Sequence, residues 1–386
     1  MLKVAVIFGG RSVEHEVSII SAVQAMSKMD KNKYEILPIY VTKDLEFRYG
    51  YPLRTIEIYR DMDLLKRNTK EVNLIKKNGK VYIATNSLFR KLISEVDVFF
   101  PVGHGTTLED GSLQGMLSLM DLPIVGPKTL SASIGQDKVI QKLLYEKEGI
   151  KTLEFTWFYE KEYEDNSKDI INKCEKLKYP LIIKPASLGS SIGISTASNK
   201  NELVKGIEDA LTYDSKIVVE KKLENFKEVN ISVMGMPFDA KLSPIEEVKG
   251  KDKILSFNDK YIGGSKKSKG MVNASRIIPA NISDKEKEKI EKYALQIFNL
   301  LGLEGVSRID FLISKEGEVY ANEVNTIPGS LSFYLWKEIN VSYPEEIDEL
   351  ISLAIKSYKS NKTKVRAFDS NILAGYSGVK GSKGVK

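Results

Sequence analysis

Runs of apolar residues separated by glycine and polar turns predict a mixed α/β chain. Residues 2–8 form a mostly apolar run that ends in Gly9 and Gly10, and residues 12–26 then carry apolar side chains at helical spacing. A strand, a glycine turn and a helix in this order are typical of a doubly wound parallel-sheet domain. The same pattern predicts further strands at 34–41, 81–85 and 96–102, and a helix at 112–120.

Polar residues directly follow two of these strands. Glu14, His15 and Ser18 come after the first strand, and His104 comes after the strand at 96–102. Ligands of open α/β sheets bind at the carboxyl ends of strands, so we predict a substrate mouth here. The chain has two histidines, and their similar placement favours a shared pocket. Helix capping is the plainer interpretation of the acidic residues in these turns, Glu14, Glu16, Glu109 and Asp110.

The next part of the chain presents lysines that suit a phosphate. A helical pattern begins at residue 131 and carries Lys138 and Lys142 one turn apart. A strand is predicted at 181–185, and Lys184 lies in it just ahead of a Gly-Ser-Ser loop. A point charge beside exposed backbone N–H donors is suited to a phosphate group. An ordinary tight turn is the alternative.

Two glutamates and a lysine-rich loop come next. Glu220 follows an apolar run and is placed to accept hydrogen bonds from a nucleotide base, and Glu228 from ribose hydroxyls. The segment 249–270 is rich in glycine and lysine but contains aromatic residues, which predicts a mobile lid rather than a linker. Further strands are expected at 152–158, 217–223 and 229–234, and helices at 284–301 and from the capping box at 342–345 to about 360.

The region from 308 to 329 carries the strongest pattern. Two apolar runs flank the polar segment 315–317, which predicts a β-hairpin. A turn centred on the Glu-Gly pair of that segment places Asp310 opposite Glu323. The same register places Arg308 opposite Asn325. Two facing carboxylates repel, and a magnesium ion held by both and by the Asn325 carbonyl would remove the conflict; a solvated face is the alternative.

Composition narrows the class of protein. At 386 residues the chain is long enough for two or three domains, and 42% hydrophobic with 28% charged residues is typical of a soluble globular protein. The sequence shows neither a signal-like start nor an apolar run near the ~18 residues that span a bilayer, so we expect a cytoplasmic protein without a membrane partner. The single cysteine, Cys174, excludes an intrachain disulfide. The net charge of +6 is spread over interspersed lysines and glutamates, so nucleic acid is not an expected partner.

The ordered motifs resemble those of the D-alanine–D-alanine ligase family of the ATP-grasp superfamily. They are GG-S-EHEVS, HG-EDG-QG, DK-K, KP-GSS-G, an EK pair with a later E, RID and EVNT-PG, and they cover roughly residues 1–358. The resemblance implies an α/β chain, α+β in its C-terminal part, in which a doubly wound parallel-sheet domain precedes an ATP-grasp fold. The implied divisions are 1–127, 128–218, 219–362 and a basic, disordered tail at 363–386.

The resemblance also implies roles for individual residues. ATP contacts fall on Lys138, Lys184, Glu220, Lys221, Glu228 and the lid residue Lys260. The metal ligands are Asp310, Glu323 and Asn325. The catalytic groups are Glu14, which holds the first ammonium group, Ser190 and Tyr261, which meet over it, and Arg308 with the Gly329 backbone, which stabilise the oxyanion. The substrate-binding residues are His104, Ser332 and Phe333.

The implied reaction has two steps. ATP, with two magnesium ions or manganese in their place, phosphorylates the carboxylate of one D-alanine, and the amine of a second D-alanine then displaces phosphate to form a dipeptide for peptidoglycan. The loop after Gly329 is shorter than is usual in the family, and its aromatic residues Phe333, Tyr334 and Trp336 belong either to the acceptor site or to the core. Another amino-acid pair is therefore one alternative, and a nucleotide-binding relative without turnover is another. A homodimer is compatible with the sequence.

Overall fold

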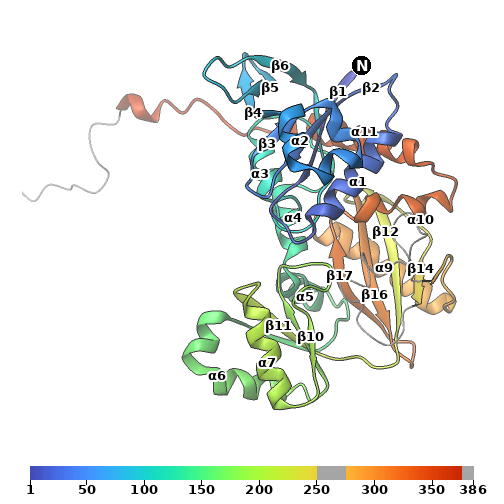
Figure 1. Ribbon diagram of the computed structural model, residues 1–386. Coiled ribbons are helices and arrows are strands. Elements are labelled where there is room, and N and C mark those ends of the chain that lie inside the picture. The colour runs from blue at the N-terminus through green and yellow to red at the C-terminus, as the bar shows by residue number, and fades with distance from the viewer. Residues whose placement is uncertain (250–274, 376–386) are drawn as a thin grey trace, which may run out of the picture.

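The computed structural model describes residues 1–249 and 275–375, which build three β-sheets in chain order (Figure 1). In that view the first sheet lies at the top, the second at the lower left and the third at the right. The strands of the first sheet are β1 (Leu2–Gly9), β2 (Tyr34–Val41), β3 (Phe47–Tyr49), β4 (Lys70–Lys77), β5 (Lys80–Thr85), β6 (Leu92–Val96) and β7 (Val98–Pro101). The helical segments of this part are α1 (His15–Lys28), η1 (Tyr51–Arg54), η2 (Ile56–Arg60), α2 (Met62–Asn68) and α3 (Ser112–Ser118).

The first sheet combines a parallel centre with an antiparallel extension. Its strand order is β6-β5-β4-β3-β2-β1-β7, and β1 pairs in parallel with β2 and β7, as predicted for a doubly wound domain. The strands from β3 to β6 pair antiparallel. Asn78 and Gly79 between β4 and β5 both have positive φ, which suits a two-residue hairpin turn. The segment between β2 and β7 therefore widens the sheet.

The second sheet is small and carries the lysine-rich loop. It has the order β10-β9-β11-β8, with β8 (Phe155–Tyr159), β9 (Leu181–Pro185), β10 (Ser195–Ala197) and β11 (Lys216–Lys221). Its helices are α4 (Thr129–Gln136), α5 (Lys138–Lys147), α6 (Glu160–Glu175) and α7 (Lys200–Leu211). The helix expected from residue 131 is two helices, because Asp137 is extended and its carboxylate caps α5. The predicted boundary at 218 would cut β11, so we propose that the boundary follows Lys221.

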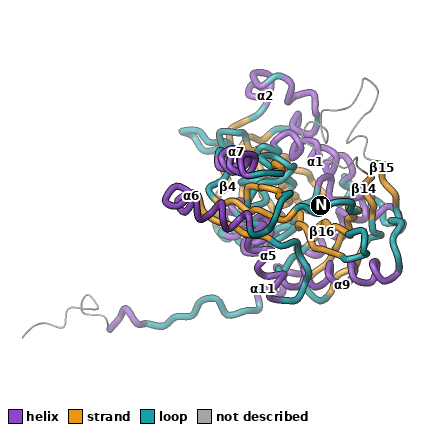
Figure 2. Tube along the Cα trace, turned by 90° about the horizontal axis from the view of Figure 1, so that it is seen from below, coloured by secondary structure: helices purple, strands orange, loops and turns teal. Residues whose placement is uncertain are grey.

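The third sheet is antiparallel and has one apolar and one polar face. Its strands are β12 (Lys227–Met236), β13 (Asp239–Leu242), β14 (Glu246–Lys249), β15 (Ser275–Ile277), β16 (Gly305–Ile313) and β17 (Val319–Asn325), in the order β15-β14-β12-β16-β17 with β13 beside β12. Val229, Ile231, Ile309 and Phe311 share a buried cluster with residues of α9 (Asp284–Leu300). Alternate residues of these strands face the other way and are free to build a site. Figure 2 shows α9 and the pair α6 and α7 at opposite sides of the molecule.

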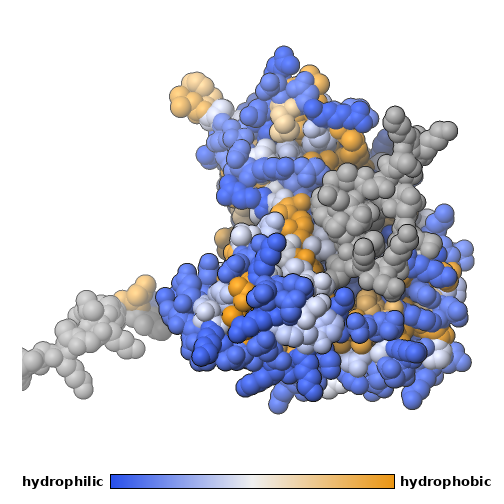
Figure 3. All heavy atoms as spheres, turned by 60° about the horizontal axis from the view of Figure 1, so that its bottom comes forward, coloured by the Kyte–Doolittle hydropathy of each residue, from blue (hydrophilic) through white to orange (hydrophobic). Residues whose placement is uncertain are grey.

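The last described helices are α10 (Phe333–Lys337), after the turn η3 (Gly329–Ser332), and α11 (Tyr343–Lys362), followed by η4 (Ile372–Gly375). The predicted capping box of Ser342 and Glu345 opens α11. Lys260 and Tyr261 of the predicted lid lie outside the described residues. Among residues 1–249 and 275–375, no helix combines the length and apolar character needed to cross a membrane. The face seen in Figure 3 is mostly hydrophilic, with scattered hydrophobic residues.

Candidate active site

The hairpin of β16 and β17 has the predicted register. Asp310 pairs with Glu323, and Arg308 pairs with Asn325. The turn is centred on Glu316 and not between Glu316 and Gly317 as predicted, and a bulge between Asp310 and Phe311 restores the predicted pairing of Asp310 with Glu323. Bulges of this kind often re-aim side chains next to active sites.

A row of polar residues crosses the third sheet on the face opposite α9. Glu246 on β14 pairs with Asn230 on β12, and Asn230 pairs with Asp310. Asp310 pairs in turn with Glu323, so four strands contribute to one row. Sequence analysis identified the two hairpin residues but missed Asn230 and Glu246, because an isolated polar residue in a strand is also what a solvated strand shows.

The Asp310 carboxylate is fully hydrogen-bonded. Arg308 binds it through two bonds, Nε to Oδ1 at 2.7 Å and Nη2 to Oδ2 at 2.8 Å. Asn325 Nδ2 donates to Oδ2 at 3.2 Å, and the Asn230 amide, oriented with its nitrogen toward the carboxylate, donates to Oδ1 at 3.2 Å. These four bonds occupy about as many lone pairs as a carboxylate offers.

Both hairpin carboxylates have a cationic partner, which sequence analysis did not anticipate. Lys138 Nζ of α5 lies 3.3 Å from Glu323 Oε2, and Arg308 pairs with Asp310. The two carboxylates are therefore compensated by side chains of the protein, and their pairing alone does not require a metal ion. The metal assignment stays a prediction, because within the described ranges no three Asp, Glu, His or Cys side chains gather into a metal site.

A buried ion-pair cluster lies in the second sheet. Lys184 Nζ on β9 donates to Glu220 Oε2 on β11 at 2.9 Å. Lys142 Nζ of α5 lies 3.1 Å from Glu220 Oε1 and donates to Thr152 Oγ1 at 2.8 Å. Burial alone would raise the pKa of Glu220, but the two ammonium groups outweigh it and lower the pKa to about 2. The carboxylate predicted to contact a nucleotide base therefore faces two lysines instead.

The other predicted nucleotide contacts surround this cluster. Lys138 Nζ donates to the carbonyl oxygen of Leu188 in the loop after β9 at 2.6 Å, so one lysine connects that loop with the hairpin. Lys221 is exposed at the end of β11, and Glu228 lies on the polar face of the third sheet. Lys138 thus connects the loop after β9 with Glu323 of the third sheet.

Two loops enclose the carboxylate of Glu14. It lies at the start of α1, is 8% exposed and accepts a hydrogen bond from Ser190 Oγ. A Cβ atom at Gly189 would lie 2.8 Å from Glu14 Oε2, and one at Gly105 would lie 3.0 Å from it. Both loops therefore approach the Glu14 carboxylate so closely that any side chain at these glycines would collide with it. Ser12 Oγ accepts from the Glu14 N–H at 3.0 Å, but Glu14 is the N-cap residue of α1 and no side chain caps the helix. The capping interpretation is therefore wrong for this turn, although Glu16 lies in the first turn of the helix as expected.

The two histidines have different surroundings. His15 contacts Gly10 O at 2.6 Å and Tyr40 Oη at 2.9 Å, both within the first sheet region. No ring partner is common to His15 and His104 in the described part of the chain, so the predicted shared pocket is not supported. His15 supports the fold, and His104 is the histidine at the site.

His104 connects the first and third sheets. Its Nδ1 lies 2.9 Å from Ile327 O and its Nε2 lies 2.9 Å from Ser21 Oγ. A carbonyl oxygen only accepts, so Nδ1 carries the proton and Nε2 accepts from the serine. Burial lowers the pKa of His104, while Glu14 nearby acts in the opposite direction, and the ring is neutral at pH 7.

Glu109 makes a second connection between these sheets. Its Oε1 accepts from the Ile327 N–H at 2.9 Å and from Thr326 Oγ1 at 3.3 Å. Burial and then the nearby Glu14 raise its pKa to about 7. The predicted capping role holds for Asp110, which accepts from the first N–H of α3, but is wrong for Glu109.

The turn after Gly329 is strained. Ser330, Leu331 and Ser332 have φ angles of 49°, 57° and 57°, and a left-handed conformation costs an L residue about 1–2 kcal/mol. Ser332 Oγ is buried and has no hydrogen-bond partner among the described residues. Phe333 follows with its ring 4.5 Å from that of Tyr343.

The aromatic residues after the turn pack mainly inside the protein. Trp336 is fully buried and donates to Ser232 Oγ at 3.1 Å, and the stacked Phe333 packs against the same core. Tyr334 donates to Glu246 Oε2 at 2.8 Å, so it extends the polar row of the third sheet. Tyr334 is therefore the aromatic residue of this segment nearest to the polar face.

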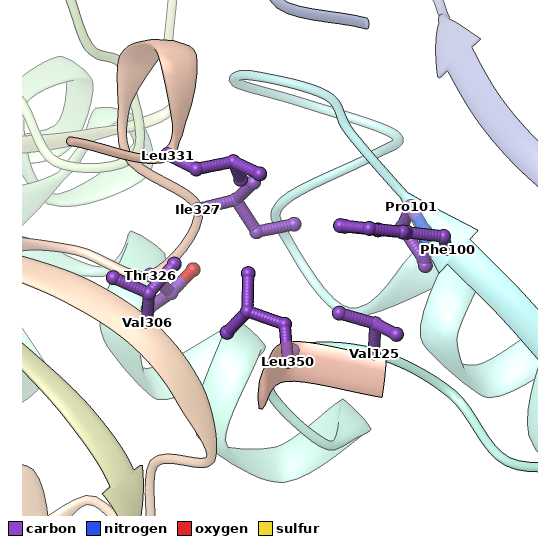
Figure 4. Close-up of a pocket in the computed structure, with 9 residues that line it drawn as sticks. Phe100, Pro101, Val125, Val306, Thr326, Ile327, Leu331 and Leu350 are labelled. Atoms are coloured by element: carbon purple, nitrogen blue, oxygen red, sulfur yellow. The ribbon is translucent and has the colours of Figure 1, made fainter. Parts of the chain in front are cut away.

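An apolar junction closes the space behind the turn. Figure 4 shows Leu331 and Ile327 directed toward Phe100 and Pro101 of β7, with Leu350 of α11 beside them. The cavity between them measures about 10 Å³, which admits at most one water molecule. This junction anchors the turn and is too small to bind a ligand.

The fold and site define an ATP-grasp ligase that joins a carboxylate to an amine. Two family models match the chain, the D-ala D-ala ligase N-terminus over residues 3–127 and the D-ala D-ala ligase C-terminus over residues 144–352. The chain belongs to the D-alanine–D-alanine ligase family. The family is ATP-dependent, so ATP and a divalent metal ion are the expected cofactors.

Individual relatives resemble the chain over nearly its full length. The D-alanine–D-alanine ligase of Thermosipho africanus is 40% identical over 374 residues, which cover 96% of this chain and 98% of that protein. The solved D-alanine-D-alanine ligase of Coxiella burnetii superposes with a TM-score of 0.79 at 25% identity, covering 94% of this chain and 96% of that one. The VanG D-Ala:D-Ser ligase of Enterococcus faecalis gives 0.75 at 32% identity, covering 92% and 99%.

Proposed function

We propose that this protein is an ADP-forming ligase that joins two D-alanines into D-alanyl-D-alanine. The observation that carries the proposal is that Glu14 and Arg308, which belongs to the Asp310–Glu323 hairpin, both lie close enough to His104 to act on its charge, in a chain 40% identical to a named ligase. Such a product serves peptidoglycan synthesis, and we place the reaction in the cytoplasm, where ATP is available. A homodimer remains part of the proposal.

The first amino acid binds by its charges. The buried Glu14 carboxylate, oriented by Ser190 Oγ, holds the ammonium group. The neutral His104 lies beside the carboxylate that is to be activated. Glu14 acts to raise the pKa of His104 and Arg308 acts to lower it. Arg308 is held in place by two bonds to Asp310, and its charge and the Gly329 N–H stabilise the oxyanion that forms when the amine attacks.

The hairpin suits a divalent ion, which we propose to be magnesium, two ions with ATP bound. Asp310, Glu323 and Asn325 supply the oxygen ligands that hard cations prefer, and phosphate oxygens complete the shell. Asp310 has no free lone pair in this structure, because Asn325 donates to it. Rotating the Asn325 amide by a half turn frees one lone pair of Asp310 Oδ2, which still accepts from Arg308 Nη2, and offers the amide oxygen to the same ion. The charge of the metal neutralises the phosphoryl group as it is transferred.

The lysines face the phosphates. Lys138 and Lys184 each lie within reach of a backbone loop or carboxylate that fixes the ammonium group. Glu220 orients Lys184 and Lys142 rather than binding the base through its carboxylate. Lys221 and Glu228 remain candidates for contacts with the base and ribose, as do Lys260 and Tyr261 of the lid for closing the site.

The second amino acid binds at Ser332 and Phe333 in this proposal. D-serine is the second candidate acceptor, because the structurally similar VanG protein is named a D-Ala:D-Ser ligase and because the Ser332 hydroxyl is buried without a partner within the described residues. A site built around a hydroxyl discriminates strongly between acceptors that do and do not pair with it.

The test is ADP release with single and paired amino acids, with the dipeptide identified by mass. We expect release with D-alanine and not with L-alanine, and one dipeptide bond for each ADP. ATP binding without ADP release under every pairing would instead identify a nucleotide-binding relative. Preferred use of D-serine at equal concentrations would select the second candidate.

A further inference from the structure

The turn at residues 329–332 needs outside support. Ser330, Leu331 and Ser332 are three successive non-glycine residues in the left-handed region. A Cβ atom there crowds the following carbonyl oxygen, so such residues occur singly, and a run of three persists only where surrounding contacts fix it. The contacts that fix this turn therefore decide where its last residues lie.

Helix α1 of the first sheet region supplies polar support. The Ser330 N–H donates to Ser21 Oγ at 3.1 Å, and Ser330 Oγ donates to Gln24 Oε1 at 2.6 Å. Ser21 and Gln24 are three residues apart and so share one side of the helix. The side chain of Leu331 enters the apolar junction seen in Figure 4, which holds the middle of the turn.

The Ser21 hydroxyl donates one hydrogen bond and accepts another. His104 Nδ1 must donate to Ile327 O, so His104 Nε2 accepts the single Ser21 hydroxyl proton. The lone pairs of Ser21 Oγ are then left to accept the Ser330 N–H. Ser21 is 1% exposed, so water is not available to replace either bond.

We propose that Ser21 and Gln24 are positioning residues for the acceptor subsite. They hold Ser330 in the left-handed turn and thereby set the direction of the Ser332 hydroxyl, which has no partner among the described residues, whereas the Phe333 N–H donates to Ser330 O within the turn. This inference rests on the proposed function, which places the second amino acid at Ser332 and Phe333. Without either contact the turn relaxes toward ordinary geometry, and the acceptor loses affinity while activation of the first amino acid continues.

The experiment separates the two half-reactions. Hydroxylamine attacks the acyl carbon of the activated donor and releases phosphate, so hydroxamate formation measures the first step without the acceptor subsite. Dipeptide synthesis over a range of D-alanine concentrations then gives the acceptor KM. The variants are Gln24→Met, which loses the acceptor oxygen, Gln24→Glu, which keeps one, and Ser21→Ala. Ser27→Ala is the matched control, an exposed serine of α1 whose hydroxyl bonds only the backbone of Gln24.

We expect Gln24→Met to raise the acceptor KM about fivefold to tenfold, the effect of one hydrogen bond. Ser21→Ala loses two buried hydrogen bonds and should raise the acceptor KM at least as much. In Gln24→Met, hydroxamate formation should stay within about twofold of the parent, and Gln24→Glu and Ser27→Ala should resemble the parent in both assays. Adding Ser330→Gly to Gln24→Met should recover acceptor affinity, because glycine adopts positive φ without strain.

An unchanged acceptor KM, or equal loss in the two assays for Gln24→Met, would overturn the positioning role. If Ser21→Ala does not fold, the Gln24 pair and the glycine rescue still decide the question. A parent protein that forms neither hydroxamate nor dipeptide would contradict the proposed function itself.

Discussion

The buried carboxylate of Glu220 allows a stability prediction to be worked from the structure. The two adjacent lysines lower its pKa from 4.5 to about 2 against the effect of burial. At about 1.4 kcal/mol for each pH unit, this corresponds to about 3 kcal/mol of stabilisation at pH 7. Glu220→Gln keeps the volume and removes the charge, so it leaves Lys142 and Lys184 buried without a counterion. We expect it to destabilise the second sheet by about 3 kcal/mol.

The pH dependence has a definite sign. The folded-state pKa lies below that of the unfolded chain, so the stabilisation is fully present above pH 4.5 and is lost as the pH falls toward 2. The difference in folding stability between the parent and Glu220→Gln should therefore stay constant from pH 6 to 7 and become smaller below about pH 4.5.

Hydrogen exchange read by mass spectrometry measures this locally. At pH 7 the amides of β8, β9 and β11 should lose roughly 150-fold in protection if about 3 kcal/mol is removed, whereas those of β1 and β2 should change little. Glu224→Gln, at an exposed site just beyond β11, is the matched control. A loss of protection of less than tenfold at pH 7, or a difference between the parent and Glu220→Gln that becomes larger as the pH falls, would refute the reasoning.

Three further predictions concern the hairpin and its connections. Glu323→Gln should fold normally but lose roughly 100-fold or more in ADP release, because a predicted metal ligand is neutralised. Glu318→Gln, directly before β17, is the control, and near-parental turnover of Glu323→Gln would show the metal assignment to be mistaken. The pKa of Glu109 is raised to about 7, so its ionisation lowers the stability of the parent as the pH rises from 4.5 to 7. In thermal unfolding, the stability of Glu109→Gln relative to the parent should therefore increase over that pH range, and a constant difference would contradict this. Ser332→Ala should leave stability within about 0.5 kcal/mol, because its hydroxyl lacks a partner in the described structure, while raising the acceptor KM about tenfold, and an unaltered KM would show the acceptor site to be misplaced.

The parts of the site that lie within one hairpin were predictable from sequence. Alternation along two short strands placed Asp310 opposite Glu323, and that pairing is found. The bulge beside Asp310 was not predicted, and the register was right because the bulge offsets the shift of the turn centre to Glu316. Local patterns determine which residues share a face, whereas the local turn geometry depends on packing that a pattern does not contain.

The contacts between distant segments were not predictable. Glu109 bonds Ile327 across 218 residues, and Ser21 bonds Ser330 across 309. In the sequence, Glu109 precedes a helix and Ser21 lies within one, so capping and ordinary helix packing describe them equally well. The orientation of Glu220 toward two lysines was missed for the same reason, since Lys142 and Lys184 come from different elements.

Different parts of the chain contact the hairpin and the segment that follows it. Lys138 of α5 reaches Glu323, a predicted metal ligand, while Glu109 and His104 of the first sheet region hold Ile327 a few residues further on. The two positions are therefore fixed by different parts of the chain. Substitutions in α5 should therefore alter phosphoryl transfer with little effect on the acceptor. Substitutions in α1 that reach Ser330 should do the reverse, which gives the first sheet region a role in choosing the second amino acid.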